Sequence, residues 1–192
     1  FFYDLGIRGM QLTYNMQNWV GSGCCERHDG PLSTFGLQLM EEMEYQGIMV
    51  DLSHCGDATT LDALRHAKKP PAFTHVGVRA LCNAYGRNKT DEMFKLLGEK
   101  GGVAGITFFP AFVKRNNTTH EVLPSTIEDV LDAIDHVVRL IGVDHVVFGS
   151  DMSSKWLDLG QPPPTSVLRF FRKEYPHVFG VGPTEKYEPY PE

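Results

Sequence analysis

Several features that mark whole classes of protein are missing from this sequence. No apolar run approaches the roughly 20 residues that a membrane-spanning helix needs, and no signal peptide is recognisable. The net charge is −6, and no dense cluster of lysine and arginine marks a nucleic-acid surface. No GxGxxG segment follows a strand-like run, so the phosphate loop of a dinucleotide-binding fold is absent. We therefore expect neither a membrane nor a nucleic acid as a partner.

Cysteine is also scarce. The chain has four cysteines, and no two of them form a CxxC pair, which argues against a zinc ribbon or a thioredoxin-like redox site. Cys24 and Cys25 are adjacent, and adjacent cysteines rarely pair with each other. This pattern favours free thiols in a reducing compartment, so we expect a cytoplasmic protein.

The remaining composition is that of an ordinary globular protein. The 192 residues are 42% hydrophobic and 22% charged, which is enough for one sizeable core. The first residue is Phe1 rather than a methionine, and it lies in a segment that looks like the end of a helix. We therefore expect that N-terminal sequence is missing from this chain.

Apolar, strand-like runs alternate with helical patterns along the chain. Strands are predicted at 7–14, 48–54, 71–75, 102–109 and 145–151, and helices at 34–47, 57–70, 90–102 and 125–142. After about residue 155 the composition changes to many prolines and aromatics. We therefore divide the chain into a domain at 1–155 and an irregular segment at 156–192, with one short helix around 165–174.

Local signals mark the ends of the predicted helices. The residues expected to start or end the first two helices are Ser33 or Thr34, Gly47, Asp57 and Pro70. Ser125 and Glu128 form a capping box for the last helix. The apolar stripe predicted for that helix consists of Ile127, Val130, Leu131, Ile134, Val138 and Ile141.

Strands that alternate with helices imply a parallel sheet and an α/β fold. The predicted strands are apolar almost throughout, as expected where both faces of a sheet are covered. Two architectures fit this pattern, an open doubly wound sheet and a (β/α)8 barrel. About five strands are present, which is fewer than the eight of a barrel.

Polar residues fall at the ends of the predicted strands. Tyr14, His54, His75 and Asp151 each end one of them. In a parallel barrel these ends share one rim, where the active site is built. One such histidine is more often structural, but two on successive strands, about 4.8 Å apart, suit one metal ion or a close metal pair. We predict a metal site suited to zinc, which needs further ligands besides these two histidines.

Three further polar residues allow two interpretations each. Asp51 and Ser53 either orient His54 by a hydrogen bond or satisfy neighbouring backbone groups. Arg87 is either a solvated loop charge or a clamp for a substrate carboxylate. The other histidines are predicted to lie outside the site, on helices, in loops or at the opposite rim: His28, His66, His120, His136, His145 and His177.

Five segments together resemble one known family. They are YDLGIRGMQLTYN, GIMVDLSHCGDATTLDAL, PPAFTHVGVRALCNAYGRNKTDEM, GGVAGITFF and HVVFGSDM. The succession is similar to the renal (membrane) dipeptidase family, metallopeptidase family M19, from about residue 3 to 152. That resemblance implies a (β/α)8 barrel with two zinc ions bridged by a glutamate. It also implies hydrolysis of dipeptides, often with a D-residue at the C-terminal position.

The resemblance assigns roles to individual residues. His54 and His75 match two family histidines that bind one zinc ion, and Arg87 matches the arginine that binds the substrate carboxylate. Asp151 matches the proposed proton-transfer residue. Tyr14 stands where the family often has a histidine that polarises the scissile carbonyl, and its hydroxyl can donate a similar hydrogen bond. The implied mechanism is attack by a water that bridges the two metal ions.

The chain also departs from the family pattern. The His-x-Asp pair and the bridging glutamate are absent, as are the cysteines that form disulfides in the animal renal enzyme. We expect a bacterial-type member that lacks its N-terminal part, contains about the last five βα units of the barrel, and is inactive by itself. The expected partners are a small peptide substrate and either a second copy or the missing N-terminal segment.

Two other functions remain open at this point. The chain could belong to another metal-dependent barrel amidohydrolase, acting on a lactone or a cyclic amide. It could also be a metal-poor relative that binds without catalysis. Dependence on a free substrate carboxylate distinguishes the first from a dipeptidase, and failure to bind metal identifies the second.

Overall fold

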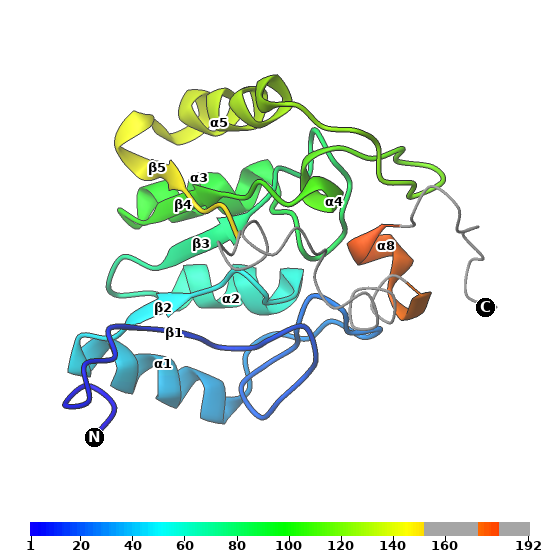
Figure 1. Ribbon diagram of the computed structural model, residues 1–192. Coiled ribbons are helices and arrows are strands. Elements are labelled where there is room, and N and C mark those ends of the chain that lie inside the picture. Colours follow the sequence, from blue (N-terminus) through cyan, green and yellow to red (C-terminus); the bar gives the residue numbers. More distant parts are fainter. Residues whose placement is uncertain (152–172, 181–192) are drawn as a thin grey trace.

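A parallel five-stranded sheet forms the centre of the computed structural model, which describes residues 1–151 and 173–180. Every pair of neighbouring strands is parallel. The strands are β1 (Gly9–Gln11), β2 (Met49–Asp51), β3 (Ala72–Val76), β4 (Val103–Ile106) and β5 (Val146–Phe148). They lie side by side in chain order, from β1 in blue to β5 in yellow (Figure 1). The α/β class and the parallel sheet predicted from the sequence are confirmed.

Helices connect the successive strands. They are α1 (Thr34–Gln46), α2 (Asp57–His66), α3 (Asp91–Glu99), the short α4 (Pro110–Val113) and α5 (Ile127–Ile141); a 3-10 turn, η1 (Val143–His145), precedes β5. Because the strands follow in chain order and parallel crossovers are right-handed, successive helices fall on the same side of the sheet. Accordingly, α1 contacts α2, α2 contacts α3, and α3 contacts α5. The strand order has no reversal of the kind that defines a doubly wound sheet.

The hydrophobic core lies between the sheet and these helices. Phe73 of β3 and Phe94 of α3 meet edge to face in it, with ring centroids 5.8 Å apart. Met40 of α1 and Leu64 of α2 belong to the same buried cluster. This continuous core fixes the strand ends relative to one another, and the candidate site is built at those ends.

The sequence predicted some helix ends correctly and missed others. Ser33 caps α1 by accepting a hydrogen bond from the Gly36 backbone N–H, and Gly47 ends this helix in the left-handed conformation, with φ of 78°. The prediction that Asp57 caps α2 is wrong. Gly56 occupies the cap position, and the Asp57 carboxylate instead accepts two hydrogen bonds from Arg79, at 2.5 and 2.7 Å.

The capping box of α5 is also shifted from its predicted position. Thr126 and Asp129 form it, one residue later than Ser125 and Glu128. Lys114 makes a 2.8 Å ion pair with Asp129, so this carboxylate is already fixed beside the helix start. Because α5 begins one residue later than predicted, its capping box includes Asp129, the carboxylate that Lys114 fixes in place.

The outer strand β5 and helix α5 are more exposed than predicted. Val147 and Phe148 are 47% and 76% exposed, although the strands were expected to be buried on both faces. Ile127 and Leu131 of the predicted stripe are also exposed, and the fully buried positions of α5 are Val130, Ala133 and Val137. Among the residues that the structure describes, β5 pairs only with β4, which leaves its other edge uncovered.

A short C-terminal helix, α8 (Pro176–Phe179), lies close to α4 (Figure 1). Arg115 is buried and donates hydrogen bonds to the carbonyls of His177 and Val178, at 2.9 and 2.6 Å. Phe179 packs on Phe112, with ring centroids 5.7 Å apart. Most of the segment predicted to be irregular, 156–192, lies outside the described residues. So does the helix predicted around 165–174, except for its last two residues, which are helical.

Two further expectations concern the whole chain. No helix within 1–151 or 173–180 is both long enough and apolar enough to cross a bilayer. All four cysteines are free, as the sequence predicted, and the structure shows that all four are also buried. The thiols therefore belong to the packed interior rather than to any covalent cross-link.

We expect Glu44→Leu to destabilise the fold. The buried Glu44 carboxylate accepts hydrogen bonds from the backbone N–H groups of Lys68 and Lys69, at 2.9 and 3.1 Å, and so ties α1 to the loop after α2. Without this acceptor, the free energy of unfolding should fall by about 1–3 kcal/mol, measured by urea unfolding of the full chain. Glu42→Leu is the control, because Glu42 is exposed and, within residues 1–151 and 173–180, its carboxylate accepts a hydrogen bond only from Gln46, at 2.7 Å. Equal losses in both variants would contradict the prediction.

Candidate metal and substrate site

Two histidines converge at the carboxyl ends of β2 and β3. His54 lies three residues beyond the end of β2, and His75 is the penultimate residue of β3. Their Nε2 atoms are 2.9 Å apart, and their ring centroids are 4.9 Å apart. His54 is buried and His75 is half-buried. The structure thus brings together the two histidines that the sequence placed on one rim.

The ring of His54 is oriented by Asn15. His54 Nδ1 lies 2.6 Å from Asn15 Oδ1, and an amide oxygen can only accept a hydrogen bond. His54 Nδ1 therefore carries the hydrogen. In the neutral ring, Nε2 is then a bare lone pair, and it points toward His75.

The ring of His75 is oriented by a longer chain of hydrogen bonds. The Thr74 hydroxyl donates to Asp51 Oδ2 at 2.6 Å, which uses its only hydrogen. It must then accept from His75 Nδ1, which lies 2.9 Å away. Burial raises the pKa of Asp51, but hydrogen bonds from Ser53 and Thr74 outweigh this and hold the pKa below its usual value. Asp51 is therefore an acceptor, and Nε2 of His75 is also a lone pair.

Both imidazoles are held neutral by their surroundings. Burial and the nearby positive charge of Arg87 lower the pKa of His54 and that of His75. Two lone pairs thus face each other at 2.9 Å, an arrangement that is repulsive until a cation lies between them. The donor set therefore fits a metal that accepts imidazole nitrogen. No group of three or more His, Cys, Asp or Glu residues gathers around such a position in the described part of the chain.

Two buried cations flank His54. Arg87 donates from Nη1 to the Ser53 carbonyl at 2.9 Å, and Lys89 donates from Nζ to the Cys55 carbonyl at 2.7 Å. Burial lowers the pKa of Lys89 to about 8. The Nε and Nη2 groups of the fully buried Arg87 find no hydrogen-bond partner within the described ranges. Because burying unpaired donors of a charged group is costly, these two N–H groups are suited to an anionic ligand.

Tyr14 and Asp151 lie at the edge of this centre. The Tyr14 ring stacks on His54, with centroids 4.2 Å apart and planes 22° apart, while 65% of the residue is exposed. Asp151 is exposed and has a left-handed backbone, with φ of 56°. Its negative charge acts to raise the pKa of His75 and of Arg87, although burial prevails in both. All five predicted site residues therefore belong to one region.

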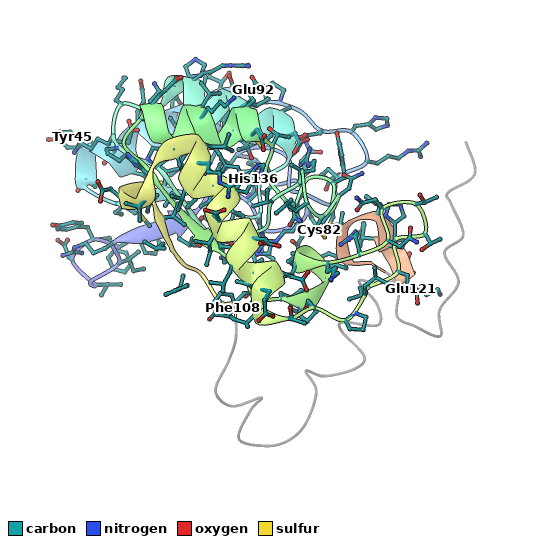
Figure 2. All side chains as sticks on the ribbon, turned by 90° about the horizontal axis from the view of Figure 1, so that it is seen from above. Tyr45, Cys82, Glu92, Phe108, Glu121 and His136 are labelled. Carbon is teal, nitrogen blue, oxygen red and sulfur yellow. The ribbon has the colours of Figure 1, made fainter. Side chains whose placement is uncertain are left out.

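Two of the other histidines make structural contacts between elements. His136 of α5 pairs with Asp91 of α3 at 2.9 Å, and Figure 2 shows α5 lying across α3 with His136 labelled between them. His145 bonds the Gly102 carbonyl at 2.7 Å. These contacts lie outside the region of the five site residues.

The sequence missed three residues of the site. Asn15 was overlooked, although a left-handed position directly after Tyr14, with φ of 62°, is one that asparagine tolerates better than most residues. Thr74 was overlooked because its role depends on contacts with Asp51. Lys89 was not considered, because nothing in the sequence shows that it is buried. Of the two interpretations of Asp51 and Ser53, the second is confirmed: Asp51 accepts from the backbone N–H groups of Ser53 and Thr74, and the Ser53 hydroxyl accepts from that of His75. The first is wrong in its target, because the side-chain hydrogen bonds lead through Thr74 to His75.

Comparison with known proteins places the chain in a family. Residues 1–159 match the family model described as membrane dipeptidase (peptidase family M19). An uncharacterized dipeptidase of Schizosaccharomyces pombe is 33% identical over 154 residues, covering 78% of this chain and 36% of that protein. The dipeptidase aclJ of Aspergillus oryzae is 33% identical over 153 residues, covering 78% of this chain and 35% of that protein.

A solved structure agrees with this placement. The crystal structure of an amidohydrolase from Pseudomonas aeruginosa is 34% identical with a TM-score of 0.71, covering 93% of this chain and 58% of that one. The chain thus spans about a third to three-fifths of the length of these relatives. The family model, in contrast, matches most of the chain. The chain belongs to the membrane dipeptidase family, peptidase family M19.

Proposed function

We propose that this chain is the part of a zinc-dependent dipeptidase that supplies two histidine ligands and the arginine for the substrate carboxylate. The observation that carries this proposal is the pair of Nε2 lone pairs of His54 and His75, which face each other at 2.9 Å. Hydrogen bonds on both Nδ1 atoms favour this orientation over a mutual hydrogen bond between neutral rings. Membership of a dipeptidase family supports the choice of reaction.

Zinc is the metal that best suits these ligands. Imidazole nitrogen is a common zinc ligand, and a hydrogen bond to the other ring nitrogen strengthens it as a donor. When bound, a zinc ion supplies Lewis-acid chemistry, which polarises a carbonyl and makes water a stronger acid. Two histidines do not complete such a centre. We infer that the remaining ligands come from outside the described residues, among which no group of three or more His, Cys, Asp or Glu residues gathers. The second metal ion is an implication of the family resemblance.

The chain's own residues hold the substrate and move the proton. The unpaired Nε and Nη2 groups of Arg87 bind the terminal carboxylate of the dipeptide, which selects short peptides with a free C-terminus. The Tyr14 hydroxyl donates to the scissile carbonyl as its oxygen becomes more negative. Asp151 takes a proton from the attacking water and returns it to the leaving amine.

We further propose that residues 1–155 form a consecutive part of a (β/α)8 barrel. Five parallel strands in chain order, with successive helices in contact, are the arrangement expected of such a part. Barrel closure also accounts for the exposed Val147 and Phe148 of β5, because consecutive strand residues point to opposite faces, and the further strands and helices of a closed barrel would cover both faces.

Removing either histidine should weaken zinc binding. We expect His54→Ala and His75→Ala each to lower the affinity for Zn²⁺ by more than about 100-fold. Removing a residue that merely orients a metal ligand already lowers metal affinity by about 10- to 100-fold. Competition with a chromophoric chelator measures this. His66→Ala is the matched control, because His66 is exposed and contacts only Asp62 of its own helix. These affinities are measured on the protein as isolated from its cell, because two histidines alone do not complete a zinc centre. If that wild-type protein binds no Zn²⁺, the non-catalytic alternative replaces the dipeptidase proposal.

Arg87 should make activity depend on a free substrate carboxylate. We expect Arg87→Lys to raise KM for L-Ala-D-Ala by about 10- to 100-fold, because the lysine keeps the charge but loses the two-pronged contact. The C-terminally amidated dipeptide should be a poor substrate of both proteins. Arg65→Lys is the control, because Arg65 is exposed and pairs only with Glu92. Faster turnover of a cyclic dipeptide or lactone than of the dipeptide would favour the amidohydrolase alternative.

Asp151 should affect turnover more than binding. We expect Asp151→Asn to lower kcat by about 100-fold or more while KM changes little, since the amide cannot carry the proton. Steady-state kinetics of the protein as isolated from its cell measures both constants. Asp144→Asn is the control, because Asp144 is exposed in the turn before β5, at the opposite end of that strand. Unchanged kcat in Asp151→Asn removes this residue from the mechanism.

A further inference from the structure

Strand β3 breaks the usual alternation of side chains. Phe73 and Val76 are both fully buried in the core between the sheet and the helices. In a regular strand, residues three positions apart point to opposite faces. Thr74 and His75 lie between them. Both face the site, because Thr74 bonds His75 and the His75 ring contacts His54.

The pairing with β4 explains this break. Phe73 lies opposite Ala104, and Val76 lies opposite Ile106. β3 therefore advances three residues while β4 advances two, which is a β-bulge at Thr74 and His75. Because of the extra residue, the His75 ring faces His54 instead of helix α3. The Thr74 hydroxyl also comes within 2.9 Å of His75 Nδ1.

Two glycines on neighbouring strands leave room for the bulge. A Cβ atom on Gly105 of β4 would lie 2.1 Å from the Thr74 carbonyl oxygen, and one on Gly149, just after β5, would lie at the same distance. Real Cβ atoms do not approach a backbone oxygen this closely. The Thr74 carbonyl therefore occupies space that any side chain at either glycine would take.

We propose that Gly105 and Gly149 are positioning residues for His75. By lacking side chains, they admit the Thr74 carbonyl, permit the bulge, and so turn the His75 imidazole toward His54 with Nδ1 bonded to Thr74. The orientation of His75 matters for catalysis only under the proposed function, in which His75 is a metal ligand. The bulge itself can be tested without metal.

The first test is a double-mutant cycle of zinc affinity. We expect Gly105→Ala and Gly149→Ala each to weaken Zn²⁺ binding by about 10- to 100-fold. In a His75→Ala background, the same substitutions should have no further effect, because they act through His75. Equal losses in both backgrounds would show general destabilisation and overturn the proposal.

Gly9→Ala is the matched control. Gly9 lies in β1 of the same sheet, and an added Cβ would meet only the flexible end of Met49, at 3.2 Å. We expect it to leave Zn²⁺ affinity within about twofold of wild type, as for a site away from the ligands. A loss as large as that of Gly105→Ala would show that any strand glycine matters equally, which contradicts a specific role.

The second test needs no metal, and its first measurement uses the wild-type chain alone. Nitrogen-15 NMR of the histidine rings in the metal-free wild-type chain should show the hydrogen of His75 on Nδ1, as its bond to Thr74 requires. In folded Gly105→Ala, this signal should shift toward the Nε2–H form. If the wild-type His75 ring carries its hydrogen on Nε2, the proposal that Gly105 and Gly149 position His75 is wrong. Failure of wild-type protein to bind Zn²⁺ would instead count against the proposed function alone.

Discussion

The site depends on one buried carboxylate, that of Asp51. It accepts hydrogen bonds from the backbone N–H and the hydroxyl of Ser53, at 3.0 and 2.6 Å, and from the same two groups of Thr74, at 3.1 and 2.6 Å. The ladder between β2 and β3 pairs Asp51 with Ala72. Beyond this pair, β3 forms its bulge. There the Asp51 side chain, rather than the backbone ladder, links β2 to β3 through its hydrogen bonds from Thr74. A buried charge is costly unless it is fully hydrogen-bonded, and this one is. Stability of the sheet and orientation of His75 therefore have the same source.

Positive charge balances this carboxylate on the other side of the site. Arg87 and Lys89 come from the loop after β3, and their donors bind the carbonyls on either side of His54. They fix the turn that carries His54, and the charge of Arg87 also disfavours a proton on either imidazole. A group that holds the fold thus also favours neutral imidazoles. Arg87 also rests on the Phe112 ring, 4.9 Å from its centroid, and Phe112 in turn packs on α8.

Much of this arrangement could be predicted from the sequence, for identifiable physical reasons. Apolar periodicity gave the order of strands and helices, and the common rim of parallel strands gave the neighbourhood of His54, His75 and Asp151. The cap of α5 was predicted one residue too early, at Ser125 and Glu128, because the tertiary pair of Lys114 with Asp129 that accompanies the observed cap cannot be seen in the sequence. The β3 bulge left a signal that was not used: two apolar residues three apart, with a polar pair between them, do not fit a regular strand.

Arg115 has a consequence for the order of folding. Its guanidinium is buried by a four-residue helix that begins 61 positions later in the chain, and so short a helix is not stable by itself. Helix α8 can therefore form only after the segment around Arg115 has taken its final shape, and closing so long a loop slows that step. During synthesis, nearly all of the described chain must therefore leave the ribosome before α8 can pack on Phe112, the residue on which Arg87 rests. The corner of the molecule around Arg87 should be the last to become rigid.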